Sequence, residues 1–397
     1  MRRLSLVLLL CLGGFVVGAG AHDTAPTGSA AVSRTSRWQA PVTISSLPAG
    51  QGPLYGPLVA LDGRGKEAAN FDIIAIDLVG RQTNITHNPA DDLAPAVALD
   101  GRIAFVSTRS GNGADLYVMD GDGRNVRSLT TGDMATWDDA LDLSQESWSP
   151  RGDKIAYDGL YAAVGPPCEH DCALWDVLIL DSDGSGLKQI APNGRAPAWS
   201  PDGRRLAYES DVDIYNNYGG GVTITRLDGS GSVHLNAFNP SGDVGPVWAP
   251  NGDELAFQAS RAEGFPSSIY VVRPDGRRKR RLALGHNPTW SPDGRRLAFI
   301  DHYKLFTIDR NGGRKRRVSR QGEFVIGEAW SPRGAMLAYV AGTRHRNGGL
   351  PTNLRVETAS GNGTRVHVLA REPDFSTFGP PVWTPDGRRI LVAVDAH

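Results

Sequence analysis

The sequence is poor in cysteine, in methionine and in net charge. Its 397 residues include 3 Cys and 4 Met, and 42 Lys and Arg nearly balance 43 Asp and Glu. So few cysteines exclude a small scaffold held together by many disulfides. The net charge of −1 argues against nucleic acid as a partner, because such binders usually carry a large positive charge. Apolar residues still make up 40% of the chain, which excludes wholesale disorder.

The amino terminus carries the one long apolar run. Met1-Arg2-Arg3 is followed by an apolar stretch over 4–17 and by the small residues Ala19-Gly20-Ala21. This order predicts a signal peptide over residues 1–21, and hence a secreted or periplasmic protein. An uncleaved anchor is the alternative, but the run is shorter than the roughly 20 residues of a membrane span. Residues 22–50 are rich in Ala, Ser, Thr and Pro and predict a flexible tether before a domain over 51–397.

The rest of the chain repeats one short motif, spaced 40 to 53 residues apart. Six copies begin with tryptophan, at Trp148, Trp199, Trp248, Trp290, Trp330 and Trp383. Each Trp is followed by Ser-Pro-Asp-Gly or a close variant and then by a triplet such as Leu206-Ala207-Tyr208. A degenerate copy without tryptophan lies at Val97–Gly101.

The motif has the chemistry of a tight hairpin. Proline fixes φ at the second turn position, Asp or Asn suits the third, and glycine accepts the left-handed conformation. The first two strands therefore form a hairpin, and a third strand such as Asp115–Met119 and a fourth such as Val126–Leu129 follow. Four antiparallel strands per repeat are typical of propeller blades, so the sequence predicts an all-β propeller.

The pattern Trp-Ser-Pro-Asp-Gly-x-x-Leu-Ala-Tyr resembles the WD40-like (PD40) repeat of TolB-type β-propellers. The same repeat occurs in the propeller domains of prolyl oligopeptidase relatives. The resemblance covers about residues 55–397 and implies a fold rather than a function, because the repeated residues are structural. TolB has an α/β domain before its propeller, where this sequence has the predicted tether. The sequence also contains no Gly-x-Ser-x-Gly nucleophile motif, which argues against a peptidase of the prolyl oligopeptidase class.

The number of blades follows from the two ends of the repeat region. Six complete repeats lie between Val97 and Trp383. The copy that begins at Trp383 has only two strands. Phe71–Asp77 and the residues to Thr86 look like an unaccompanied third and fourth strand. We therefore predict seven blades, with one blade built from both ends of the region, because such closure removes exposed sheet edges. Six blades, as in TolB itself, is the alternative.

Ligand sites of propellers usually lie at the mouth of the central channel, where the chain enters each innermost strand. The charged residues at these positions are His87, Asp91, Asp92, Glu146, Arg195, Asp243, His286 and Glu328. Glu146 and Glu328 each stand two residues before their tryptophan, a position that is proline in most other blades. We expect the two carboxylates on far sides of one channel, where they would contact water, a cation or a cationic side chain of a partner.

Two basic runs begin the fourth strand of adjacent blades. They consist of Arg277, Arg278, Lys279, Arg280 and Arg281, and of Arg314, Lys315, Arg316 and Arg317. We expect them side by side on the outer rim. They would bind an anionic envelope polymer, a phosphate-bearing ligand or an acidic partner. Alternatively, they would protect an exposed edge strand from pairing with other sheets.

The segment containing Cys168 and Cys172 favours a local disulfide in an exported protein. A metal site that uses the thiols with His170 and Asp171 is the alternative, but one Cys-x3-Cys spacing is weak evidence for zinc. Asp120-Gly-Asp122-Gly and Asp181-Ser-Asp183-Gly contain fragments of calcium-loop chemistry, but they are expected to be hairpin turns. We therefore predict neither a metal nor a cofactor.

These patterns favour a binding scaffold over an enzyme. The repeats account for nearly the whole region, and the expected partner is a protein or an envelope ligand. An enzyme with its site at the channel mouth, such as a hydrolase or a lyase, is the alternative reading.

Overall fold

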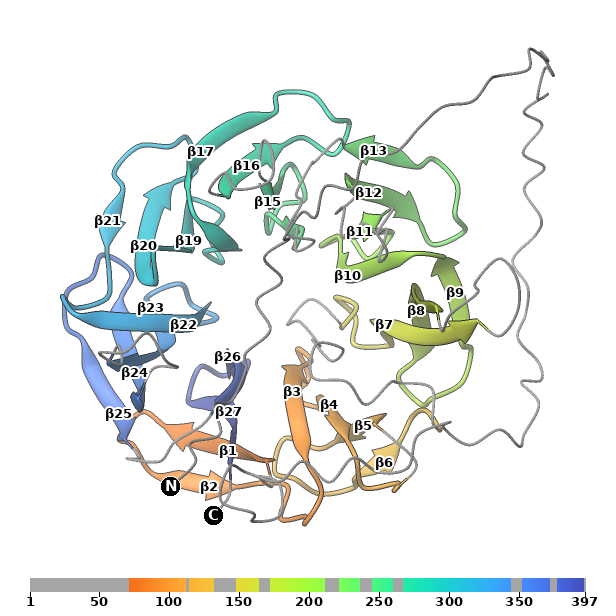
Figure 1. The fold of residues 1–397 in the computed structure, drawn as a ribbon, viewed down its shortest axis with the longest axis horizontal. Helices are drawn as coiled ribbons and strands as arrows, with labels where there is room; N and C mark the ends of the chain where they lie inside the picture. Colours follow the sequence, from red (N-terminus) through yellow and green to blue (C-terminus); the bar gives the residue numbers. More distant parts are fainter. Residues whose placement is uncertain are drawn as a thin grey trace, which may run out of the picture.

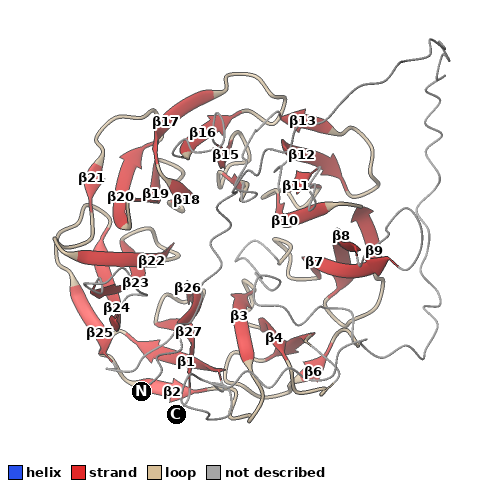
Figure 2. Cartoon of the chain, viewed as in Figure 1, coloured by secondary structure: helices blue, strands red, loops and turns tan. Residues whose placement is uncertain are grey.

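The computed structural model describes residues 71–111, 114–131, 148–163, 172–210, 221–235, 245–259, 267–343, 352–371 and 377–395. These residues form a ring of seven antiparallel sheets around a central axis (Figure 1). Strands and loops make up all of the described chain (Figure 2), so it includes no helix that could span a membrane. The predicted all-β propeller is confirmed with seven blades, and the six-bladed alternative is wrong.

The blades follow one another in chain order, each beginning with its innermost strand. Blade 1 comprises β3 (Asp92–Val97), β4 (Ile103–Ser107), β5 (Asp115–Met119) and β6 (Arg127–Ser128). Blade 2 comprises β7 (Lys154–Ala163), β8 (Cys172–Asp181) and β9 (Lys188–Ala191), and a single bridge between Trp148 and Ile155 marks its inner edge. Blade 3 comprises β10 (Gly194–Trp199), β11 (Arg205–Ser210), β12 (Gly221–Arg226) and β13 (Val233–Leu235).

The remaining blades have the same order. Blade 4 comprises β14 (Val247–Trp248), β15 (Leu255–Ala259), β16 (Ser268–Val272) and β17 (Arg280–Leu284). Blade 5 comprises β18 (His286–Trp290), β19 (Arg296–Asp301), β20 (Lys304–Asp309) and β21 (Arg316–Arg317). Blade 6 comprises β22 (Glu323–Trp330), β23 (Met336–Thr343), β24 (Thr352–Ser360) and β25 (His367–Arg371).

The seventh blade joins the two ends of the repeat region. Its sheet has the order β26 (Thr377–Trp383), β27 (Arg389–Asp395), β1 (Phe71–Asp77) and β2 (Gln82–Asn84). Strands β1 and β27 pair along their whole length, from Phe71 opposite Asp395 to Asp77 opposite Arg389. The predicted closure by strands from both ends is therefore confirmed.

The repeated motif forms the turn that was expected from its residues. In blade 3 the N–H of Gly203 donates to the carbonyl of Ser200 at 2.8 Å, and Gly203 adopts a φ of +68°. The hydroxyl oxygen of Ser200 also accepts a hydrogen bond from the N–H of Arg205 at 3.0 Å. The degenerate copy closes in the same way, because the N–H of Gly101 donates to the carbonyl of Ala98 at 2.9 Å.

The hydrophobic core lies between neighbouring sheets. Trp248 packs with Ala198 and Ala207 of blade 3, and its indole N–H donates to the carbonyl of Ala198 at 3.1 Å. The small alanine side chains allow the sheets to approach, and the tryptophan fills the space that remains.

An arginine of the preceding blade covers the outer face of several of these indoles. The guanidinium carbons of Arg102, Arg205 and Arg296 lie 5.0, 4.8 and 5.0 Å from the ring centres of Trp148, Trp248 and Trp330. Each arginine directly precedes the apolar triplet of its own blade. These cation–π contacts hold one blade against the next.

Candidate functional site

Because the strands are antiparallel, the connections between them alternate between two faces of the ring. We call the face that carries segments 85–91, 192–193 and 318–322, which link successive blades, the loop face. The opposite face carries the two hairpin turns of each blade, and we call it the turn face. Five described candidates belong to the loop face, because they precede an innermost strand or lie at its start: His87, Asp91, Asp92, Arg195 and His286. Glu328 instead lies near the far end of β22, two residues before Trp330.

His87 and Asp91 lie in the connection between blades 7 and 1. His87 is exposed, adopts a φ of +46°, and donates its N–H to Asn84 Oδ1 at 3.0 Å. Asp91 is half-buried, and its Oδ1 accepts a hydrogen bond from the N–H of Phe71 at 3.0 Å. Asp91 therefore links the closing strand β1 to blade 1, whereas the His87 side chain is available to solvent.

Asp92 is fully buried, with 0% of its surface exposed. One guanidinium nitrogen of Arg109 lies 2.7 and 2.8 Å from its two carboxylate oxygens. The same guanidinium lies 5.1 Å from the ring centres of Phe105 and Tyr117. Burial raises the pKa of Asp92, although the Arg109 hydrogen bond and charge oppose the rise. Asp92 is a packing residue within blade 1 and is not open to a ligand.

Arg195 and His286 lie on innermost strands and are both half-buried. Arg195 stands opposite Glu209 in blade 3, and His286 stands opposite Ile300 in blade 5. Glu146, Asp243 and Cys168 lie outside the described residues. So does the side chain of Cys172, whose backbone begins β8.

Glu328 differs from the expectation of a hydrated carboxylate. It is only 4% exposed and stands opposite Tyr339 on the strand next to it. Its Oε1 is buried and has no hydrogen-bond partner in the described part of the chain. Burial raises the pKa of Glu328 to about 8. The corresponding residue in five other blades is a buried proline: Pro95, Pro197, Pro246, Pro288 and Pro381. The position is therefore buried in the protein, and glutamate brings there a carboxyl group whose Oε1 has no described partner.

The structure places both basic runs where the outermost strands of adjacent blades begin, at β17 and β21 in Figure 1. Each run starts in the turn before its strand and ends on the strand itself. A methyl group added at Gly312, in the turn before β21, would lie 3.6 Å from the Leu282 side chain of β17. The two rim segments are therefore in contact range.

Four of the nine basic side chains are held by the protein itself. Lys279 lies 5.4 and 5.1 Å from the ring centres of Phe257 and Tyr270. Arg280 donates to the buried carboxylate of Glu254 at 2.6 Å. Lys315 donates to Asp301 Oδ2 at 2.9 Å, and Arg317 donates to the carbonyl of Arg320.

The other five are exposed: Arg277, Arg278, Arg281, Arg314 and Arg316. Arg314 lies 3.7 Å from Asp309, with 79% of its side chain exposed. The remaining four form no ion pair with a described residue. We call Arg277, Arg278, Arg281 and Arg316 the free rim arginines.

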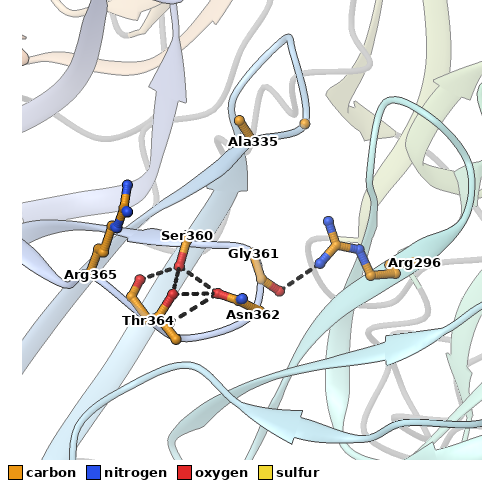
Figure 3. Close-up of a pocket in the computed structure, with 8 residues that line it drawn as sticks. Arg296, Ala335, Ser360, Gly361, Asn362, Thr364 and Arg365 are labelled. Atoms are coloured by element: carbon orange, nitrogen blue, oxygen red, sulfur yellow. Dashed lines mark hydrogen bonds between the residues drawn. The ribbon is translucent and has the colours of Figure 1, made fainter.

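The structure also contains a polar pocket of about 410 Å³ on the turn face between blades 5 and 6, which was not predicted from the sequence. Figure 3 shows Arg296 on one side of the turn that follows β24 and Arg365 on the other. We call the turn residues Ser360, Gly361, Asn362 and Thr364 the floor of the pocket; Figure 3 shows Ala335 across from them, and Gly334 also lines the pocket. The arginine that directly precedes the apolar triplet was a signal in the sequence that could have indicated this pocket. In the structure such an arginine reaches a turn of the neighbouring blade, as Arg296 does.

Metal-binding chemistry is not apparent from the described residues, which include no group of three or more His, Cys, Asp or Glu side chains placed to share an ion. The Asp-Gly stretches considered for calcium form hairpin turns. In blade 1 the N–H of Gly123 donates to the carbonyl of Asp120 at 2.9 Å, and in blade 2 Gly184 donates to Asp181 at 2.8 Å.

The sequence profile of the TolB beta propeller domain (PD40) matches residues 167–397, which is more than half of the chain. The chain belongs to this family. The TolB homolog of Chlorobium luteolum is 30% identical over 149 residues, which are 34% of this chain and 31% of the homolog. The Tol-Pal system protein TolB of Anaeromyxobacter dehalogenans is 30% identical over 143 residues, 33% of this chain and 30% of that protein. The matches thus span about a third of these relatives.

Among solved structures, an oligogalacturonate lyase in complex with manganese aligns with a TM-score of 0.54 at 13% identity. The alignment covers 83% of this chain and 96% of the lyase. At this identity the similarity shows a shared fold and no shared function. Whether this TolB-family propeller binds a partner or catalyses a reaction must be inferred from its own residues.

Proposed function

We propose that this TolB-family propeller is an extracytoplasmic scaffold that binds an acidic protein partner through its outer rim and catalyses no reaction. The location follows from the signal peptide expected over residues 1–21. The supporting observation is the set of free rim arginines where the outermost strands of two adjacent blades begin. Clustered positive charge attracts an acidic surface and accelerates its association.

The proposal depends on the difference between the basic side chains that the protein itself holds and the free rim arginines. Protection of an edge strand requires charge, but it does not require that the charge stay unpaired. Lys279, Arg280 and Lys315 already place charge along these strands while being held by aromatic rings or carboxylates. Arg277, Arg281 and Arg316 extend into solvent beside them and can form bidentate contacts with carboxylates of a partner.

A capture experiment tests the proposal. The chain carries a carboxyl-terminal tag and is expressed in its own host, and proteins bound to it are recovered from envelope extract at low and at high salt. The test variant is Arg277→Ser/Arg281→Ser/Arg316→Ser. The control variant, Arg124→Ser/Arg204→Ser/Arg388→Ser, removes the same charge from exposed arginines of the turn face.

We expect one acidic protein to be recovered by the wild type and by the control at low salt, and to be lost with the rim variant or at high salt. Equal recovery by all three proteins would place the binding surface elsewhere on the ring. Failure of the wild type to retain any protein would contradict the scaffold function itself.

A further inference from the structure

The turn face carries a carboxylate in every hairpin turn except the two of blade 6. In the other six blades, the turn between the first and second strands contains Asp100, Asp153, Asp202, Asp253, Asp293 or Asp386. The turn between the third and fourth strands contains Asp77, Asp120, Asp181, Asp228, Asp275 or Asp309. The corresponding segments of blade 6 are 331–336 and 360–366, and neither contains an acidic residue. The pocket described above lies between these two segments.

Two guanidinium groups, those of Arg296 and Arg365, line this pocket between the two carboxylate-free turns. The guanidinium carbon of Arg296 lies over Trp330, 5.0 Å from the ring centre, and the side chain donates one N–H to the carbonyl of Gly361 at 2.8 Å. A guanidinium has five N–H donors, so most of those of Arg296 remain for a ligand. Arg365 is exposed and forms no hydrogen bond or ion pair with any described residue. Both cations are therefore able to bind an anion.

The floor of the pocket holds an amide donor in a fixed orientation. Asn362 Oδ1 accepts hydrogen bonds from the Ser360 hydroxyl at 2.6 Å, the Thr364 hydroxyl at 2.8 Å and the Thr364 N–H at 3.2 Å. These bonds direct the amide nitrogen toward the Arg296 side of the turn, as Figure 3 shows. The nitrogen donates to no described residue.

Blade 1 provides the matched comparison within the same chain. There Arg389 donates to the carbonyl of Gly121 at 3.1 Å, as Arg296 donates to Gly361. The turn of blade 1 reads Asp120-Gly-Asp122-Gly, whereas that of blade 6 reads Ser360-Gly-Asn362-Gly. The two carboxylates of the blade 1 turn are thus replaced by neutral side chains of similar shape in the blade 6 turn.

We infer that this pocket is a binding site for a phosphate group, either as the free ion or as a phosphate monoester. A phosphate carries a charge of about −1.5 to −2 and three strong acceptor oxygens, which match two guanidinium groups and one amide donor. The absence of carboxylates from both blade 6 turns removes the repulsion that the other turns would exert on an anion. The site lies on the opposite face from His87, Asp91 and Asp92 and does not depend on the rim proposal.

The test is calorimetric titration of the full chain with inorganic phosphate and, separately, with glycerol 3-phosphate. The decisive variant is Ser360→Asp/Asn362→Asp, which gives blade 6 the turn that blade 1 already uses. Because blade 1 folds with these residues, we expect an unchanged thermal unfolding midpoint and phosphate binding weakened at least tenfold. Arg365→Ala should weaken binding similarly, and Arg365→Lys should retain part of it.

The control is Arg124→Ala in the blade 1 turn, which should leave binding unchanged. Binding of glycerol 3-phosphate without binding of inorganic phosphate would assign the pocket to phosphate monoesters, and the reverse would assign it to the free ion. Equal binding by the wild type and by Ser360→Asp/Asn362→Asp, or no binding of either compound at millimolar concentration, would overturn the inference.

Discussion

The Nε atom of Arg310 lies 2.8 Å from Oε2 of Glu254, across the boundary between blades 5 and 4. Glu254 occupies the position before the apolar triplet, where four other blades have Arg102, Arg205, Arg296 and Arg389. At this boundary the order of charge is therefore reversed, with the acid in the earlier blade and the base in the later one. Burial alone would raise the pKa of Glu254, but Arg280 and Arg310 hold it below its ordinary value.

We expect Glu254 and Arg310 to be energetically coupled. A double-mutant cycle with Glu254→Gln and Arg310→Gln should give a coupling of about 1–2 kcal/mol in the free energy of unfolding, because the carboxylate is buried and accepts bonds from both arginines. Urea unfolding of the four proteins measures it. The exposed pair Asp122 and Arg124, 3.6 Å apart, is the control and should show almost none. Equal coupling in the two pairs would mean that burial of Glu254 does not strengthen its contacts.

Trp290 tests the packing between blades. Its side chain is buried, and its indole N–H donates to the carbonyl of Val247 in the preceding blade at 3.3 Å. We expect Trp290→Ala to lower the free energy of unfolding by about 3–5 kcal/mol, as removal of large buried aromatics does. Trp290→Phe should cost less, because it keeps most of the packing. Unfolding of the alanine variant close to that of the wild type would show that the repeated tryptophans are not part of the core.

Glu328 should make the fold less stable as pH rises. Its pKa is raised from 4.5 to about 8 in the folded protein, so between these values the folded state holds a proton that the unfolded state has lost. Stability contributed by this group is therefore fully present at low pH and is lost as pH rises toward about 8, with a slope of about 1.4 kcal/mol per pH unit. Glu328→Gln keeps an uncharged side chain at every pH. The difference in free energy of unfolding between the two proteins should grow from about pH 5 to about pH 8, and parallel curves would contradict the burial of this carboxyl group.

Leu99 stands at the turn position that is proline in the six tryptophan-containing copies. It is 75% exposed, and its turn closes through the same hydrogen bond from Gly101 to Ala98. Leu99→Pro should raise the free energy of unfolding by about 0.4–1 kcal/mol, because proline restricts the unfolded chain. Val79→Pro is the control. That residue is equally exposed, but its N–H donates to Asp77 Oδ1 at 2.9 Å, so proline should destabilise there. A loss of stability in both variants would show that the turn of Leu99 differs from its counterparts.

The fold could be predicted because its signals are local and repeated. Trp, Pro and Gly at fixed spacing determine a turn within a few residues, and even the copy at Val97–Gly101 keeps enough of that pattern to close. Phe71–Asp77 was recognisable as an outer strand without its inner strands, and in the structure it pairs with β27. The turns depend only on residues that are close in the sequence, and the closing blade follows from the number of strands at the two ends of the repeat region.

The candidate sites were harder to predict because they depend on contacts between distant residues. Asp92 and Glu328 look alike in the sequence as acids near an innermost strand, yet Arg109 pairs with the first and the second is buried without a partner for Oε1. In the basic runs, too, contacts with distant residues decide which side chains are paired. Arg280 and Arg281 are adjacent, but Glu254, 26 positions earlier, binds only the former. The pocket beside Arg365 also depends on a contact between distant residues, because Arg296 of blade 5 reaches Gly361 in the turn of blade 6.

The pairing of β1 with β27 also sets the order of events during biosynthesis. The ribosome releases Phe71 long before Asp395, so β1 and β2 emerge without the strand to which they belong. Blades 1 to 6 can each form from contiguous chain, but the ring stays open until translation has passed β27. Until then the outer hairpin of blade 7 presents an unpaired edge, which makes the nascent chain prone to association with other strands. A TolB-family propeller of this design therefore cannot complete its ring by adding blades in chain order alone, because its last blade joins the two ends of the repeat region.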